Sequence, residues 1–184
     1  MFNNAYEGKR VLVTGHTGFK GTWMTLWLQQ MGAEVIGISD QIPTDPSHFA
    51  AAGLDETMTT HWLDIRDTEA VPAAIAEIKP DFVFHMAAQA LVKASYDDPV
   101  GTYTTNMVGT ANVLEGLRLL DNTCTAVMIT SDKCYENVET YYGYREDDRL
   151  GGADPYSASK AAAELIISSH TCLLYTSPSP RDRG

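Results

Sequence analysis

The residues of this sequence best suited to chemistry are Tyr156 and Lys160, which lie four positions apart. In a helix, side chains at that spacing share one face. A phenol with an ordinary pKa near ~10 is a weak base at neutral pH, but an adjacent ammonium stabilises the phenolate. The pair is therefore suited to take a proton from a substrate hydroxyl while a hydride leaves the same carbon. Because a tyrosine beside a lysine is also a common surface arrangement, the surrounding elements must decide between the two interpretations.

The glycine-rich stretch at residues 11–21 is suited to hold a hydride acceptor. Its apolar start reads as a buried strand, and Gly15, Gly18 and Gly21 then permit a tight turn into a helix. Such a turn lets the backbone approach a pyrophosphate, which is attracted by the free N–H groups and the positive dipole end of the helix. The spacing G-x-x-G-x-x-G fits the general dinucleotide fingerprint only loosely, so an ordinary connection between a strand and a helix is the alternative.

Strands and helices are expected to alternate along the rest of the chain. We predict strands at residues 10–14, 34–39, 57–63 and 125–130, and a further strand that begins at 82–84. Helices are predicted after the glycines up to Gly32, around residues 71–78, from about Pro99 and from about Pro155. Loops are predicted at 41–56, with room for one short helical turn, and at 131–153. This alternation predicts an α/β fold with a Rossmann-like, doubly wound parallel sheet and helices on both faces.

Two of these helices have an apolar face at helical spacing. In the helix after the glycines we expect the face to lie in the core, and it consists of Trp23, Leu26, Trp27, Gln30 and Met31. The face of the helix that begins near Pro99 consists of Val100, Tyr103, Thr104, Met107, Val108, Ala111 and Leu114.

Ligands of such sheets bind beyond the carboxyl ends of the strands. The glycine turn, Asp64, residues 87–89 and residues 131–133 all fall at such ends. This coincidence of positions favours a dinucleotide-dependent enzyme more strongly than any single motif does.

Asp40 follows the second predicted strand, where an acidic residue commonly binds the adenosine ribose of a dinucleotide. It lies 25 positions after Gly15, close to the usual spacing of about 20. Ser39 could hold the ribose instead, in which case Asp40 would be a solvated loop residue.

The composition excludes several classes of protein. The chain has 184 residues and a formal net charge of -11, which argues against nucleic acid or an anionic membrane as a partner. Residues 1–10 lack the apolar run of a signal peptide, and no apolar run is long enough to span a bilayer. Cys124, Cys134 and Cys172 show neither metal-ligand nor disulfide spacing, so we expect a cytoplasmic protein without a metal site.

Several segments resemble a known family. They are residues 15–21, 43–47, 85–89, 131–137, 143–146 and 150–156. Together they are similar to the extended short-chain dehydrogenase/reductases that act on nucleotide sugars, most closely to those that dehydrate CDP-glucose. The resemblance runs from about residue 9 to residue 169. It is specific at Asp132 and Lys133, because the related dTDP-glucose dehydratases carry Asp-Glu there.

The resemblance implies a mechanism that uses NAD and a nucleotide sugar, CDP-glucose. Tyr156, assisted by Lys160 and Ser131, would oxidise the glucose C4 hydroxyl, with hydride passing to NAD. Lys133, or a group that it positions, would remove the acidified C5 proton, and Asp132 would protonate the C6 hydroxyl as water leaves. Hydride would then return from NADH to C6. Without the family, the Asp132–Lys133 pair is typical of a solvated loop ion pair.

The resemblance also gives an expected set of cofactor-binding residues. In the turn they are Gly15, Thr17, Gly18, Phe19, Lys20 and Gly21. Elsewhere they are Asp40, Asp64, Ile65, Ala87, Ala88, Gln89, Asn106, Thr130, Tyr156 and Lys160. By analogy with relatives, a homodimer through the helix after Pro99 and the catalytic helix is plausible.

Members of this family continue well beyond the catalytic helix. We therefore expect residues 1–171 to form an incomplete NAD-binding domain that exposes apolar surface and turns over little substrate. Residues 172–184 do not fit a continuation of the helix, and they resemble the translation of a sequencing adapter, so we expect them to be non-native; a genuine flexible tail is the alternative.

Two other functions remain open from the sequence. One is a related enzyme, either a 4-epimerase or a dehydratase of dTDP- or GDP-sugars. The other is a non-catalytic NAD-binding scaffold or sensor, although the presence of Ser131, Asp132, Lys133, Tyr156 and Lys160 counts against it.

Overall fold

The computed structural model describes residues 2–175 of the chain. Of the segment expected to be non-native, residues 176–184 lie outside this range. The described part contains one parallel sheet in the order β3-β2-β1-β4-β5. Its strands are β1 (Arg10–Thr14), β2 (Glu34–Ser39), β3 (Thr59–Trp62), β4 (Phe82–His85) and β5 (Thr125–Met128).

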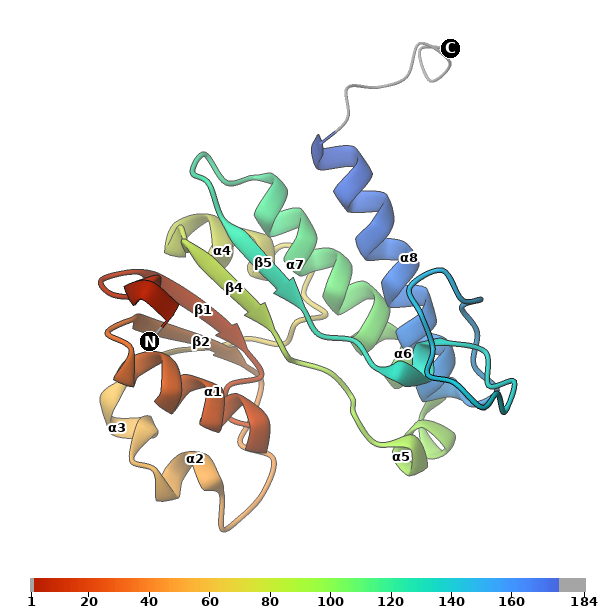
Figure 1. Cartoon of the computed structure of the whole chain (residues 1–184). Helices are drawn as coiled ribbons and strands as arrows, with labels where there is room; N and C mark the ends of the chain where they lie inside the picture. The colour runs from red at the N-terminus through yellow and green to blue at the C-terminus, as the bar shows by residue number, and fades with distance from the viewer. Residues whose placement is uncertain (1, 176–184) are drawn as a thin grey trace.

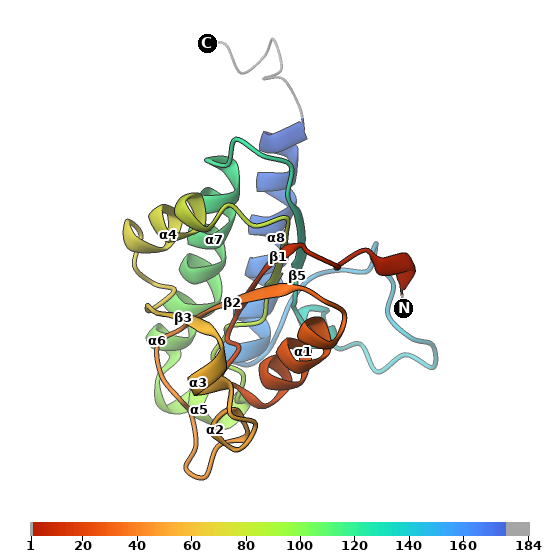
Figure 2. The same ribbon diagram turned by 90° about the vertical axis from the view of Figure 1, so that its left-hand side faces the viewer.

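Helices lie on both faces of the sheet (Figures 1 and 2). The longer ones are α1 (Phe19–Gln30), α4 (Ala70–Ile78), α7 (Gly109–Arg118) and α8 (Pro155–Tyr175). The shorter ones are η1 (Phe2–Asn4), α2 (His48–Ala51), α3 (Leu54–Thr57), α5 (Val92–Asp97), α6 (Pro99–Tyr103), the π-helical turn η2 (Thr104–Val108) and the 3-10 turn η3 (Asp132–Cys134). Helices α4, α7 and α8 cover one face and α1 covers the other (Figure 2).

The order of the strands confirms the predicted doubly wound fold. Strand β1 lies in the middle, with Val11 paired to Val35 of β2 on one side and to Phe82 of β4 on the other. The chain reverses direction across the sheet between β1 and β4, which is the point where ligands of such sheets bind. In Figure 1 the arrows of β4 and β5 point toward the end of the molecule where α5, α6 and the first turn of α8 gather.

Alternate residues of β1 enter two separate cores, one on each face of the sheet. On the side of α4 and α7, Leu12 packs in a cluster that includes Ile75 and Val113. On the side of α1, Val11 and Val13 pack with a second cluster that includes Leu28. A strand buried on both faces reads as an unbroken apolar run, which is why the sequence located β1 and β2 to the residue.

The predicted core face of α1 is wrong. Trp23 and Trp27 are 57% and 44% exposed, and the buried face consists of Gly21, Thr22, Thr25 and Leu28. The cause is the close approach of the helix to the turn before it. A Cβ atom at Gly21 would lie 2.2 Å from the Gly15 carbonyl oxygen, so small residues must face inward there.

In its first turns, the helix from Pro99 buries polar residues and not the apolar residues of the predicted face, whereas further along Leu114 of that face is buried at 4% exposure. Val100 and Val108 are 69% and 39% exposed, whereas Thr102, Asn106 and Thr110 are buried. The buried side chains are polar because they form hydrogen bonds inside the protein, as described below. The long helix that we predicted from about Pro99 is confirmed: α6, η2 and α7 follow one another without a break, and η2 is a π-helical turn within the run.

Several boundaries also differ from the prediction. Strand β3 is shorter than residues 57–63, since Thr57 belongs to α3, and β5 ends before residue 130. The predicted loop at 41–56 contains α2 and α3, and α5 was not expected. Helix α8 continues through residues 172–175, so the prediction that this segment does not continue the helix is wrong. It has neither glycine nor proline before Pro178 to end a helix.

Apolar surface is exposed beside β5, as predicted. Val127 and Ile129 are 40% and 42% exposed. Within residues 2–175, β5 pairs with β4 alone, so its other edge presents backbone hydrogen-bonding groups to solvent.

Candidate active site

The glycine turn is built at distances that no side chain would allow. Gly15 has φ +72°, and a Cβ atom there would lie 2.8 Å from the backbone of Ala87. Gly18 is the N-cap of α1 and donates its N–H to the Gly15 carbonyl at 3.1 Å. A concave stretch of bare backbone therefore precedes a 12-residue helix, and such an N-terminus can bind a pyrophosphate. In this respect the turn fits a dinucleotide.

Thr17 joins the turn to the end of β2. Its Oγ1 donates to the Gln41 carbonyl at 2.7 Å and lies 2.7 Å from Ser39 Oγ. Ser39 is 6% exposed, and its hydroxyl is already occupied by these neighbours. Asp40 is exposed, so of the two residues that the sequence left open for the ribose, the geometry favours Asp40. Phe19 and Lys20 lie exposed at the start of α1.

Asp64 and Ile65 follow β3 and lie near the turn. The Leu63 N–H donates to the Ser39 carbonyl at 3.0 Å, which places the segment beside the end of β2. Asp64 is paired with Arg66, and the buried Asn112 side chain donates to the Ile65 carbonyl at 2.9 Å.

Ala87, Ala88 and Gln89 follow β4 and are half-buried. The Gln89 N–H donates to Asn106 Oδ1 at 2.9 Å, and Asn106 Nδ2 donates to the Gln89 carbonyl at 3.0 Å and to Ser159 Oγ at 2.8 Å. Asn106 is 1% exposed. Its side chain thus holds the end of β4 against α8 and has its hydrogen bonds inside the protein.

His85 links the turn to the same network, and sequence reasoning gave it no role. Thr14 Oγ1 accepts the N–H groups of Met86 and Ala87, both at 3.1 Å, so its own proton goes to His85 Nδ1 at 2.7 Å. His85 Nε2 then donates to Thr110 Oγ1 at 3.1 Å. Burial lowers the pKa of His85 to about 3, assisted by the charge of Lys160. The sequence signal that could have identified His85 is its position as a polar residue at the end of an apolar strand.

Tyr156 and Lys160 are buried at the start of α8, at 9% and 6% exposure. This burial excludes the interpretation of an exposed surface pair. Tyr156 donates its N–H to Ser95 Oγ of α5 at 3.2 Å, and Lys160 Nζ donates to the Ile129 carbonyl at 3.5 Å. Burial lowers the pKa of Lys160, while the charge of Glu164 opposes that shift. Glu164 in turn accepts a hydrogen bond from Thr130.

Ser131, Asp132 and Lys133 form the short turn after β5. The Ser131 hydroxyl donates to Asp132 Oδ1 and accepts the Lys133 N–H, both at 3.2 Å. The side chains of Asp132 and Lys133 are exposed. The ion pairs found within residues 2–175 do not include one between these two residues.

This turn is tied directly to the start of α8. The Gly151 N–H donates to the Cys134 carbonyl at 2.8 Å. A Cβ atom at Gly152 would lie 2.4 Å from Ser157 Cβ, so the segment before α8 lies flat against its first turn. The structure thereby brings the two reactive groups that the sequence singled out to the carboxyl end of the parallel sheet, the end at which the glycine turn also lies.

The described part of the chain has neither a metal-binding cluster nor a membrane-spanning helix. No group of three or more His, Cys, Asp or Glu side chains there could hold a metal ion. None of the helices within residues 2–175 has the length and apolar character needed to cross a membrane.

Known proteins resemble this chain over most of its length. A family model described as GDP-mannose 4,6 dehydratase matches residues 12–172. The chain is 53% identical to CDP-glucose 4,6-dehydratase of Salmonella typhimurium over 165 residues, which are 90% of this chain and 46% of that protein.

Solved structures of nucleotide-sugar epimerases and dehydratases also resemble this chain. A UDP-glucose 4-epimerase from Thermus thermophilus in complex with NAD superposes with a TM-score of 0.75 at 31% identity, over 90% of this chain and 51% of that one. A dTDP-glucose 4,6-dehydratase from Streptomyces venezuelae with NAD bound has a TM-score of 0.75 at 25% identity, over 88% and 51%. The chain thus spans about half the length of the relatives that it matches.

Proposed function

The chain belongs to the family described as GDP-mannose 4,6 dehydratase, and on that premise we propose that it carries the cofactor site and the catalytic residues of an NAD-dependent CDP-glucose 4,6-dehydratase. The observation that carries this proposal is the burial of Tyr156 and Lys160 at the edge of the sheet where the glycine turn lies. The 53% identity to the Salmonella enzyme supports CDP-glucose as the substrate.

NAD is the cofactor of this proposal. Gly15, Gly18 and Gly21 provide the backbone for the pyrophosphate, Asp40 accepts hydrogen bonds from the ribose, and Asp64 with Ile65 holds the adenine. The remaining contacts come from Thr17, Phe19, Lys20, Ala87, Ala88, Gln89 and Thr130, with Asn106 acting through Gln89. When bound, NAD would supply a reversible acceptor for the hydride that leaves C4 and returns to C6, so that the net change is the loss of one water.

Tyr156 is the base for the C4 hydroxyl. The buried ammonium of Lys160 stabilises the phenolate, since a charge interaction is strong where water is excluded. Ser131 holds the hydroxyl of the substrate in place. Once the C4 hydroxyl has lost its proton, C4 can release a hydride. The ketone that forms at C4 then acidifies the proton on the neighbouring C5.

Lys133 and Asp132 carry out the loss of water. Lys133 removes the C5 proton, or positions the group that does, and Asp132 donates a proton to the departing C6 hydroxyl. A lysine base must be partly neutral, which requires burial or positive neighbours, yet the Lys133 side chain is exposed. We therefore propose that the 184-residue chain alone binds NAD but turns over little CDP-glucose.

The oligomeric state and compartment belong to the same proposal. The exposed apolar residues Val100, Tyr103 and Val108 lie on α6 and η2, and a homodimer would cover them. We place the enzyme in the cytoplasm, because its cysteines suit a reducing compartment.

A hybrid protein tests the reaction. Residues 1–171 are joined to the part of the Salmonella enzyme that this chain does not match, and the hybrid is incubated with CDP-glucose and NAD in D₂O. We expect loss of one water and incorporation of one deuterium at C5, measured by mass spectrometry. Tyr156→Phe should abolish the product, whereas Tyr6→Phe, remote from the site, should not.

The outcomes separate the alternatives. A product that has the same mass as the substrate, without loss of water, and that differs only in its configuration at C4 would show a 4-epimerase. Better conversion of dTDP-glucose or GDP-mannose would show a dehydratase of another nucleotide. A hybrid that binds NAD tightly but converts none of these sugars would favour a non-catalytic NAD-binding scaffold or sensor.

A further inference from the structure

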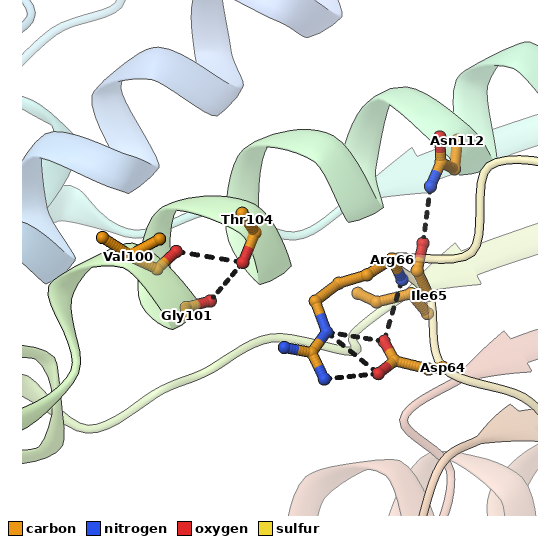
Figure 3. A network of polar contacts seen from close by, with 7 residues as sticks. All are labelled: Asp64, Ile65, Arg66, Val100, Gly101, Thr104 and Asn112. Carbon is orange, nitrogen blue, oxygen red and sulfur yellow. Dashed lines mark hydrogen bonds and ion pairs between the residues drawn. The ribbon is translucent and has the colours of Figure 1, made fainter.

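Arg66 surrounds the carboxylate of Asp64 with three donors (Figure 3). Its Nε lies 3.0 Å from Oδ1 and 2.9 Å from Oδ2, and its Nη2 lies 2.5 Å from Oδ2. The backbone N–H of the same residue donates to Oδ1 at 2.9 Å. A planar guanidinium that binds a carboxylate in this way fixes its orientation as well as its position.

The pair has room for one further donor. An ionised carboxylate offers about four acceptor positions, and Arg66 supplies three donors. The side chains of Arg66 and Asp64 are 49% and 36% exposed, and exposed ion pairs contribute little to stability. The main effect of the ion pair is therefore to fix the direction in which the remaining acceptor position of Asp64 points.

The backbone under Asp64 is held independently of Arg66. Asn112 Nδ2 of α7 donates to the Ile65 carbonyl at 2.9 Å (Figure 3). The Ile65 side chain fills the space that Gly109 leaves, since a Cβ atom at Gly109 would lie 2.5 Å from Ile65 Cδ1. With the backbone anchored on α7, the torsions of the Asp64 side chain are the freedom that remains for Arg66 to restrict.

Asp64 is kept as an acceptor. The hydrogen bond from the Arg66 side chain is the largest of the effects that lower the pKa of the Asp64 carboxyl. A carboxylate without a proton accepts hydrogen bonds from amino groups and repels a carbonyl oxygen. At the adenosine end of a dinucleotide, this chemistry distinguishes a 6-amino purine from a 6-oxo purine.

We propose that Arg66 is a positioning residue that aims Asp64 at the 6-amino group of the adenine, and so sets the preference of the site for an adenine dinucleotide over a 6-oxo purine dinucleotide. The inference rests on the proposed function, because it requires NAD to bind with its adenine at Asp64.

The test compares two dinucleotides that differ at one position. Dissociation constants of the 184-residue chain are measured by calorimetry for NAD and for nicotinamide hypoxanthine dinucleotide. One hydrogen bond to a charged group predicts a preference for NAD of about 10- to 100-fold. In Arg66→Ala we expect the preference to fall to about threefold or less.

The Arg66→Lys variant separates the effect of the positive charge on binding from the effect of the guanidinium on the orientation of Asp64. The carboxylates of Asp64, Asp40 and Asp98 all favour the positive charge of Arg66, so its removal also weakens binding of both anionic dinucleotides. Lysine restores the charge without the planar fork. We expect Arg66→Lys to recover most of the affinity for both dinucleotides and little of the preference between them.

Arg118→Ala is the matched control. Arg118 makes a similar forked pair with Glu115 on α7, at 2.7 and 2.5 Å, and its half-exposed side chain lies away from the glycine turn. The preference for NAD should be unchanged in this variant. Thermal melts monitored by circular dichroism verify that each variant is folded.

Each result bears on one of the two proposals. If Arg66→Ala keeps the wild-type preference for NAD, or weakens the binding of both dinucleotides by the same factor, Arg66 does not orient Asp64 and the inference is overturned. If the wild-type chain binds neither dinucleotide, or binds both equally, the proposed adenine site itself fails. Asp64→Asn, whose amide can donate to a 6-oxo group, should bring the two affinities together or reverse their order if that site is correct.

Discussion

Acidification should destabilise this fold through two buried imidazoles. His85 and His16 are 3% and 0% exposed. Burial lowers the pKa of His85 from 6.5 to about 3, with help from the charge of Lys160, and lowers the pKa of His16 from 6.5 to about 4 against a smaller opposing effect of the Ile38 carbonyl. His85 must stay neutral to accept the hydrogen bond of Thr14.

The sign follows from the proton uptake of the unfolded chain. An imidazole in the unfolded chain takes up a proton near pH 6.5, whereas the buried ring does not until pH falls to about 4 for His16 and about 3 for His85. The stabilisation is therefore complete above pH 6.5 and is lost as the pH falls toward those values. At pH 5 the loss is about 2 kcal/mol for each ring, or about 4 kcal/mol together.

Urea unfolding at pH 7 and pH 5, followed by circular dichroism, measures this difference. The wild-type chain should lose about 4 kcal/mol of unfolding free energy, and His85→Gln should lose about half of that. Glutamine is the suitable replacement, because its amide can accept from Thr14 and donate to Thr110. His61→Gln, which changes a partly exposed histidine on β3, is the control.

A wild-type free energy that is the same at both pH values would refute the reasoning. So would a His85→Gln variant with the full pH dependence of the wild type, or a His61→Gln variant that reduces that dependence as much as His85→Gln does.

Three further predictions concern other parts of the site and the core. Gly37→Ala places a Cβ atom 2.4 Å from the His16 ring, so we expect a loss of about 1–3 kcal/mol in urea unfolding, and an unchanged midpoint would contradict it. Asp40→Ala should weaken NAD binding about tenfold and narrow the preference for NAD over NADP; calorimetry that finds both affinities unchanged would assign the ribose elsewhere. Burial, with the charge of Asp81, raises the pKa of Cys124 to about 11. Iodoacetamide at pH 8 should therefore alkylate the Cys124 thiol about 100-fold more slowly in the folded chain than in the urea-unfolded chain. Peptide mass spectrometry measures the two rates, and equal rates would show that the thiol is accessible.

The central strands and the glycine turn could be predicted because their signals are local. Strands β1 and β2 are apolar runs bounded by turn residues, and both have the predicted bounds. The pair Tyr156–Lys160 depends only on the helical repeat. The outer strands β3 and β5 are half-exposed and mixed in composition, so their ends could not be located as well.

The faces of the helices could not be predicted from apolar spacing. On α1 the aromatic stripe points outward, where Trp23 contacts His48 at 4.8 Å and Trp27 contacts Phe2 at 5.8 Å between ring centroids. The inward face is set by how closely the helix must approach the turn, which demands Gly21 whatever its neighbours are. Apolar periodicity indicates burial only where packing, and not a close backbone approach, decides which residues face inward.

The hydrogen bonds that support the site could not be predicted for a different reason, although Asn106 itself was among the expected cofactor-binding residues. Their hydrogen bonds join positions far apart in the chain: Asn106 to Ser159 across 53 residues, Asn112 to Ile65 across 47 and Thr14 to His85 across 71. No spacing rule covers such pairs, because the sheet and its helices bring them together only after folding. A residue that contacts a ligand through a turn or one helix face leaves a local pattern, whereas a residue that holds it in place does not. Mutagenesis guided by motifs alone would therefore test Tyr156 and Lys160 and leave His85 and Arg66 untouched.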